Sequence, residues 1–260
     1  MSRAPAMPRN LPTDTPLPAA QSPANSGYLF QTTLPLTSLI FLAPMIILYE
    51  IGTRFYAFDP VSHTEQRIIA FSLMQQFFSA LGATGKYMPP AAVVSILLCC
   101  HIARGDSWTT HIGHLCGMLI ESVIYAIPLR VLALLFAHYL PLYVPAEKAN
   151  ALIVLSIGAG VYEEMVFRLF LFTAMSALFV DLFKMSKLKS FLLMVAISSI
   201  LFSAYHYLGQ ETFEMRSFLF RTLAGVYFGL IFTFRGFGIT AGAHAAYDIS
   251  TVAVRLIACR

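Results

Sequence analysis

The chain has 260 residues, of which 58% are hydrophobic and only 12% are charged. A soluble globular domain carries roughly 25% charged residues, so this composition excludes an ordinary soluble enzyme and favours a membrane protein. The 17 basic and 13 acidic side chains give a net charge of +4 and are scattered along the chain. Nucleic-acid binding needs clustered Lys and Arg, so we expect no nucleic-acid partner.

Residues 1–27 form a proline-rich tail that contains six of the 14 prolines and no long apolar run. The tail lacks the apolar side chains for a core and the hydrophobic region of a signal peptide, so we expect it to be disordered and cytosolic. Residues 28–260 show no internal repeat and no second domain. We therefore predict a single integral membrane domain after the tail.

From Leu34 onward, apolar runs of roughly 18 to 25 residues recur, the length that a helix needs to cross about 30 Å of hydrocarbon. Only helices or closed barrels satisfy every backbone group in lipid, so the sequence predicts an all-α, polytopic transmembrane helical bundle. Seven spans are predicted, at about 32–53, 88–103, 113–139, 149–175, 190–208, 217–234 and 238–257. The stretch 68–78 alternates at a helical period, which favours the membrane interface, with an eighth span as the alternative.

The basic side chains of the loops do not settle the orientation, because Lys and Arg are nearly equal in number on the two sides of this arrangement. The densest basic loop, with Lys184, Lys187 and Lys189, favours the cytoplasmic side. We expect a multi-pass protein of the plasma or inner membrane, in contact with lipid, and leave its oligomeric state open.

The fourth predicted span contains Glu163, Glu164 and Arg168 within six residues. A charged side chain at bilayer depth costs about 2.5 to 3.5 kcal/mol, so each needs a partner or a function. Glu164 and Arg168 have the i,i+4 spacing of a helical ion pair and are expected to neutralise each other. Glu163 lies about 100° around the helix and must find its partner on another helix.

Two further spans supply polar groups that Glu163 could meet. The fifth contains His206, and the seventh contains His244 and Asp248, which share one helix face. These groups suffice for hydrolysis, with Glu163 as the base, His206 holding the water, and His244, oriented by Asp248, stabilising the oxyanion. Alternatively, Glu163, His206 and His244 could bind zinc with an open water position. A third alternative is a network of purely structural pairs, and spacing alone does not separate the three.

Neighbouring aromatic residues are the candidates for substrate contact, and these are Phe202, Tyr205 and Tyr247. The two tyrosines each lie one residue from a motif polar group, so they could instead mark the water interface.

Four other polar residues of apolar regions are predicted to be structural, and these are Glu50, His101, Glu121 and Arg130. Glu50 and His101 lie near predicted span ends, where snorkelling to the interface or contact with lipid headgroups is enough to accommodate a polar side chain. Glu121 and Arg130 are too far apart on their helix to pair, so each is expected to meet another helix.

Taken in order, Glu163-Glu164-x-x-x-Arg168, Phe202-x-x-x-His206 and His244-x-x-x-Asp248 resemble the three motifs of the CPBP family. This family comprises the CAAX-protease and bacteriocin-processing intramembrane proteases. The resemblance covers a motif core at 155–250 and implies an active site within the membrane, opening to a cavity that admits water and a peptide. The sequence departs from the family pattern at Leu169 and Ser203, where many members have Gly. We expect this difference to affect helix packing more than chemistry.

The resemblance also implies roles for the motif residues. Glu163 and His206 would activate water, His244 and Asp248 would form the oxyanion site, and no metal would be needed, so we expect no cofactor, with zinc as the alternative. The sequence therefore predicts an intramembrane endopeptidase of the glutamic type, acting on a membrane-associated protein or peptide. A non-catalytic immunity or transport protein is the alternative from another class. Residues 28–150 and the identity of the substrate, prenylated or not, stay open.

Overall fold

The computed structural model describes residues 27–59, 63–136, 146–209 and 211–258. The predicted tail up to residue 26 and the last three residues of the third predicted span lie outside these ranges. The described chain is almost entirely helical, which confirms the all-α prediction. Its strands are β1 (Phe58–Asp59) and β2 (Thr64–Glu65), which form a short antiparallel pair.

The first half of the chain forms helices of very different lengths. They are α1 (Tyr28–Gln31), α2 (Pro35–Tyr56), α3 (Ile69–Ala80), α4 (Met88–Arg104) and α5 (Ile112–Phe136). α2 begins at Pro35, since the first turn of a helix does not need the amide hydrogen that proline lacks. α4 ends at Gly105, whose positive φ of 67° closes the helix in the left-handed conformation that glycine favours. With 12 residues, α3 is too short to cross a bilayer.

The second half of the chain forms a continuous helical rod, a second long helix and a bent helix. Its elements are η2 (Ala146–Lys148), α6 (Ala149–Glu164), η3 (Met165–Phe170), α7 (Leu171–Ser176), η4 (Ala177–Leu182), α8 (Lys187–Tyr205), η5 (His206–Leu208) and α9 (Met215–Ala258). η3 and η4 are π-helical turns, a feature that often marks functional sites. Within η3 the carbonyl of Phe167 accepts a hydrogen bond from Ser198 Oγ at 2.9 Å, which ties this turn to α8.

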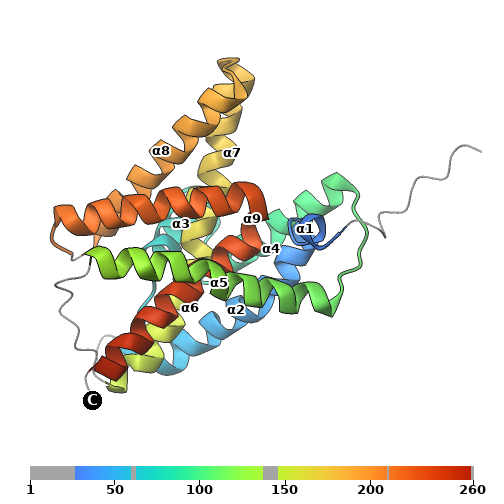
Figure 1. Cartoon of the computed structure of the whole chain (residues 1–260). Helices are drawn as coiled ribbons and strands as arrows, with labels where there is room; N and C mark the ends of the chain where they lie inside the picture. The colour runs from blue at the N-terminus through green and yellow to red at the C-terminus, as the bar shows by residue number, and fades with distance from the viewer. Residues whose placement is uncertain (1–26, 60–62, 137–145, 210, 259–260) are drawn as a thin grey trace, which may run out of the picture.

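α9 bends sharply at Gly236, where φ is 77° and ψ is −178°, a conformation that essentially only glycine adopts. The bend divides α9 into a first arm at 215–235 and a second arm at 237–258. Figure 1 shows the two arms diverging from the bend, so that both free ends of α9 lie on the same side of the molecule. The predicted sixth and seventh spans correspond to these two arms.

Within the described ranges, five helical elements are long and apolar enough to cross a membrane, at Pro35–Tyr56, Ile112–Phe136, Ala149–Leu182, Lys187–Leu208 and Met215–Ile257. The predicted count of seven or eight spans is therefore not confirmed. The bend leaves the two arms of α9 in one helical element, and α4 has only 17 residues. The outer face of α5 exposes an apolar row that includes Ile120, Ile127 and Leu134, as expected for a surface in lipid. The chain is a multi-pass integral membrane protein.

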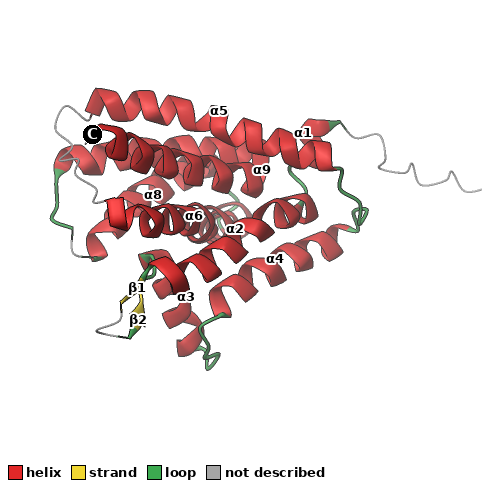
Figure 2. Ribbon diagram, turned by 90° about the horizontal axis from the view of Figure 1, so that it is seen from below, coloured by secondary structure: helices red, strands yellow, loops and turns green. Residues whose placement is uncertain are grey.

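α9 is the centre of the bundle, because it packs against α5, α6 and α8, and α2 packs against both α6 and α9. Figure 2 shows α5 and α9 on one side of the molecule and α2, α3 and α4 on the other. α6 and the second arm of α9 come into backbone contact at Gly160. A Cβ atom there would lie 2.5 Å from the carbonyl oxygen of Ala241 and 2.8 Å from Ala245 Cβ. This close approach sets the distance between the segments that carry Glu163 and His244.

Candidate active site

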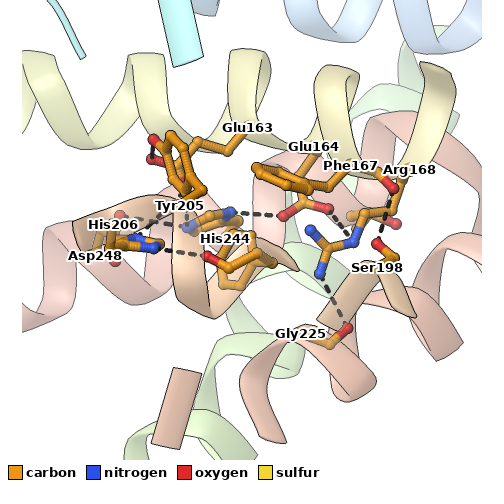
Figure 3. Close-up of polar contacts among 12 residues, drawn as sticks. Glu163, Glu164, Phe167, Arg168, Ser198, Tyr205, His206, Gly225, His244 and Asp248 are labelled. Atoms are coloured by element: carbon orange, nitrogen blue, oxygen red, sulfur yellow. Dashed lines mark hydrogen bonds and ion pairs between the residues drawn. The ribbon is translucent and has the colours of Figure 1, made fainter. Parts of the chain in front are cut away.

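The three sequence motifs meet at one place in the bundle, between the end of α6, the end of α8 and the second arm of α9 (Figure 3). The Oε2 atom of Glu163 lies 3.9 Å from His206 Nε2 and 3.8 Å from His244 Nε2. Asp248 Oδ2 lies 3.5 Å from His244 Nε2. The residues predicted to carry the chemistry are therefore brought together.

The carboxylate of Glu163 is buried, with only 5% of the residue exposed. Its Oε1 atom accepts a hydrogen bond of 2.7 Å from the hydroxyl of Tyr205. Its Oε2 atom makes no hydrogen bond with any residue that the structure describes. One oxygen of this carboxylate is thus held in place, and the other faces the two histidines.

The ring of His206 is fixed by its own helix. Nδ1 lies 2.8 Å from the carbonyl oxygen of Phe202, one turn earlier. A carbonyl oxygen can only accept, so Nδ1 carries the hydrogen and Nε2 of the neutral ring is an acceptor. Two acceptors 3.9 Å apart can both receive hydrogen bonds of about 2.8 Å from one water molecule.

Glu164 connects two parts of the site. Its Oε2 atom lies 3.1 Å from Arg168 Nε, and both side chains are completely buried, so the predicted ion pair is present. Its Oε1 atom accepts a 2.7 Å hydrogen bond from His244 Nδ1. Arg168 in turn donates to the carbonyl oxygen of Gly225 at 2.9 Å and covers the ring of Phe202 at 4.6 Å. This chain of contacts joins both arms of α9 to η3.

The ring of His244 is held on its face and at both nitrogen atoms. It stacks on Phe228, with ring centroids 4.5 Å apart and planes inclined by 22°. The contact at Nδ1 comes from Glu164, which sequence spacing did not indicate, because Glu164 lies on another helix. Asp248, the residue expected to orient the ring, instead faces Nε2, the nitrogen that also faces Glu163.

The three aromatic candidates take different places. Tyr205 is buried and uses its hydroxyl on Glu163. Phe202 packs edge-on against Phe167 and lies beneath Arg168. Tyr247 lines the cavity next to Asp248.

A cavity of about 560 Å³ lies between the two arms of α9 and reaches the candidate residues. Its walls include Glu163, His206, His244 and Asp248, together with Phe228. This volume is within the usual range of about 300 to 1,000 Å³ for ligand sites, so the site can admit water and a short stretch of peptide.

Metal ligation by Glu163, His206 and His244 was the alternative interpretation of the motifs. Within the described ranges, no group of three His, Cys, Asp or Glu side chains is arranged to hold a metal ion. The Nδ1 atoms of both histidines are hydrogen-bonded to the protein, which leaves only their Nε2 atoms toward the cavity.

The remaining polar residues of the apolar spans do not line the cavity, although Arg130 contacts Thr251, which does. Glu121 pairs with Arg235 of α9, and Arg130 donates to Thr251 Oγ1 at 3.1 Å, so both meet another helix as expected. Glu50 pairs with Arg67 at 3.0 Å. His101 is only 1% exposed and packs against Trp108, so the expected headgroup contact is wrong for this residue.

Comparison with known families agrees with this geometry. Residues 145–250 match the family model described as type II CAAX prenyl endopeptidase Rce1-like. The matched segment contains all three motifs and both arms of α9 as far as residue 250. Neither the search of curated proteins nor that of solved structures found a match. The matched segment therefore belongs to the CPBP family of intramembrane proteases, and the chain is a membrane-embedded peptide-bond hydrolase of the CAAX-protease type.

Proposed function

We propose that the chain is an intramembrane endopeptidase of the glutamic type, in which Glu163 and His206 activate water. The observation that carries this proposal is the pair of acceptor atoms, Glu163 Oε2 and His206 Nε2, 3.9 Å apart on the wall of the cavity. A water molecule between them would donate one hydrogen to each, and its lone pair would be directed to an incoming carbonyl carbon.

The groups around this water support a complete hydrolysis. Glu163 takes a proton from the water while the oxygen bonds to the carbonyl carbon of the substrate. In this proposal His244 is a doubly protonated imidazolium. Its Nδ1–H is held by Glu164, and its Nε2–H, with Asp248 beside it, is donated to the oxyanion that forms. Glu163 then returns the proton to the amide nitrogen as the C–N bond breaks, releasing a carboxylate and an amine.

Glu164 and Arg168 hold the ring of His244 in position through its Nδ1 atom. Arg168 is anchored to the Gly225 carbonyl and holds Glu164, which holds His244. These contacts fix the ring of His244 without occupying the atom that faces the cavity. We assign Glu164 and Arg168 as positioning residues.

We also propose that the reaction proceeds without a metal ion, with Glu163 itself as the base. The open Oε2 atom of Glu163 and the acceptor role of His206 Nε2 support this, because together they can activate water directly. The zinc alternative makes a different prediction, namely inhibition by 1,10-phenanthroline and recovery on addition of zinc. The glutamic proposal predicts full activity in the chelator.

The experiment uses the purified full chain in proteoliposomes. Two probe peptides are offered, an S-farnesylated peptide ending in Cys-aliphatic-aliphatic-X and the same peptide without the lipid, so that prenylation is tested separately. The reaction is run in ¹⁸O-labelled water, and mass spectrometry locates the cut and the labelled carboxylate. We expect Glu163→Gln and His206→Ala to lower kcat by about 10² to 10⁴ with unchanged folding, the usual contribution of a general base.

Glu65→Gln is the matched control, because it makes the same chemical change outside the membrane spans. It should cleave like the wild type. Full activity of Glu163→Gln would contradict the proposal and favour a non-catalytic role for the polar cluster, such as peptide binding or transport.

A further inference from the structure

An ion pair that does not line the cavity lies against α6, next to the proposed base. Glu50 of α2 pairs with Arg67 at 3.0 Å, and their side chains are only 15% and 10% exposed. Glu50 also accepts a hydrogen bond of 3.3 Å from the hydroxyl of Tyr162. Tyr162 is completely buried and directly precedes Glu163 on α6. The pair thus contacts the helical turn that carries the proposed base.

Arg67 also contacts the aromatic rings that enclose Tyr162. Its guanidinium group lies 5.1 Å from the ring centre of Tyr49 and 4.6 Å from that of Phe71. These two rings pack against Tyr162, with centroids 5.3 and 5.1 Å away. All three rings are at most 1% exposed, so Tyr162 cannot move without displacing the other two. The contacts of Arg67 therefore limit the rotation of α6 at the residue before Glu163.

The start of α3, which follows Arg67 closely in the sequence, reaches the other side of the carboxylate. Ala70 is the second residue of α3, and its backbone hydrogen-bonds to the hydroxyl of Tyr205. The first N–H groups of a helix have no acceptor within the helix, so this one is free for such a contact. The same hydroxyl donates to Glu163 Oε1 at 2.7 Å (Figure 3). Tyr205 is thus held between α3 and the proposed base.

α3 also packs against the turn that carries His206. A Cβ atom at Gly209 would lie 3.0 Å from Ile69 Cδ1, so the two segments are in close contact there. His206 begins the η5 turn, three residues before Gly209. The start of α3 therefore lies against the segments that carry both groups of the proposed water-activating pair.

We propose that Arg67 is a positioning residue that keeps Glu163 and His206 at the separation that water activation requires. It acts on α6 through Glu50, and on Tyr205 through the start of α3. The proposal rests on the hydrolytic function proposed above. Arg67 and both of its routes begin before the segment that matches the family model, so the first half of the chain has a role in the active site.

The variant Arg67→Gln tests this in the proteoliposome assay. It removes the charge that pairs with Glu50 and the group that lies over the aromatic rings. We expect kcat per folded molecule to fall about tenfold with KM unchanged, because the walls of the cavity stay as they are. Glu65→Gln is the matched control, because it alters the outer contact of Arg67 and leaves the pair with Glu50. It should keep the wild-type kcat.

A second measurement follows the site without turnover. ¹⁹F NMR of 3-fluorotyrosine at position 205, with the protein in nanodiscs, reports on the hydroxyl that donates to Glu163. Glu163→Gln in the labelled protein shows how the resonance moves when this contact changes. We expect Arg67→Gln to move the resonance from its wild-type position as well, and Glu65→Gln to leave it there.

Tyr162→Phe is a second variant that decides the question if Arg67→Gln does not fold. It removes only the hydroxyl that donates to Glu50 and keeps the packing of the rings. We expect kcat to fall about threefold with KM unchanged, the lower end of the effect of one hydrogen bond. A wild-type kcat together with a wild-type ¹⁹F resonance in this variant would overturn the proposal.

Two results with folded Arg67→Gln would also overturn the positioning role, namely a wild-type kcat or a change in KM alone. The hydrolytic proposal fails in a different way. If the wild type cleaves no peptide while the ¹⁹F resonance still depends on Arg67, the positioning role stands and the catalytic assignment falls. If the resonance does not depend on Arg67 either, both fall.

Discussion

Two of the largely buried clusters of charge in the described part of the bundle differ in how completely their polar atoms are paired. In the first, Arg235 donates to both carboxylate oxygens of Glu121, to Thr32 Oγ1 and to the Leu29 carbonyl, and the Tyr28 hydroxyl donates to Glu121 as well. In the second, at the motif residues, Glu163 Oε2 has no hydrogen-bond partner among the residues described.

This difference is what the proposed hydrolysis requires of Glu163. Both clusters place an acid and an arginine in apolar surroundings, so charge alone does not distinguish them. A buried acceptor is normally hydrogen-bonded, and an exception calls for a functional explanation. The Glu121 cluster ties α1 and α5 to α9, whereas in the motif cluster one oxygen of Glu163, a residue that lines the cavity, has no hydrogen-bond partner among the described residues.

The largest effect is expected for Glu164→Ala. It leaves Arg168 without its carboxylate at a completely buried position, which should lower the free energy of unfolding by about 3 to 5 kcal/mol. It also releases His244 Nδ1, so activity should be lost. Thermal unfolding of the detergent-solubilised protein by circular dichroism and cleavage in proteoliposomes measure the two effects. Normal stability together with normal activity would refute the bridging role of Glu164.

Glu121→Ala should lower the stability of the protein without lowering its activity. Arg235 keeps Thr32 and the Leu29 carbonyl, so we expect a smaller loss of about 2 kcal/mol in the free energy of unfolding. The kcat per folded molecule should be unchanged, because Glu121 does not line the cavity. A large drop in kcat with normal stability would show that this cluster is part of the catalytic site.

A smaller effect is expected for Tyr205→Phe, which removes only the donor to Glu163 Oε1. We expect kcat to fall about tenfold, the equivalent of one hydrogen bond, with KM and stability unchanged. The measurement also decides between two roles for this residue. A higher KM with unchanged kcat would mean that the hydroxyl contacts the substrate, as the sequence alone suggested.

The smallest effect is expected at the loop cluster outside the membrane, where Arg67 contacts Glu65, and Lys86 and Arg54 lie near it. Partial burial raises the pKa of Glu65, but the hydrogen bond and charge of Arg67, with the two other cations, outweigh it, and the pKa falls below its ordinary value of 4.5. The ionised form therefore stabilises the fold above that pH, and the contribution is lost as the pH falls through the lowered pKa.

Glu65→Gln should accordingly reduce the free energy of unfolding at pH 7 by at most about 1 kcal/mol. Well below pH 4, the wild type and the variant should unfold alike. Unfolding curves at several pH values test this, and a difference between the two proteins that grows toward acid would contradict the sign.

The sequence was sufficient for the approximate positions of the helices and for the polar residues that lie close together in the candidate site. Long apolar runs locate membrane helices because few other backbone structures satisfy their hydrogen bonds in lipid. Ionisable residues in those runs are so rare that the groups that could pair can be identified from the sequence. The break between the predicted sixth and seventh spans lies where α9 bends, but the spacing of Gly236 and Gly238 does not indicate which of them takes the positive φ. The predicted span count is not confirmed because the two arms form one helical element and α4 has only 17 residues.

The contacts within the site were predicted less well than its members. The Glu164–His244 hydrogen bond and the Tyr205–Glu163 hydrogen bond both cross between helices, so they depend on the rotation of each helix about its axis. The π-helical turn that begins at Met165 changes this rotation directly after the two glutamates. A sequence interpretation based on 3.6 residues per turn does not predict that change in rotation.

The missing side chain at Gly160 has a consequence for how such proteins diverge. The contact of its backbone with Ala241 and Ala245 sets the distance between Glu163 and His244. One added methyl group would increase that distance without changing any polar residue of the sequence. A descendant with alanine at position 160 would keep all three motifs intact and yet have lost the spacing they require. Inheritance of the activity thus depends on small residues that carry no chemistry of their own.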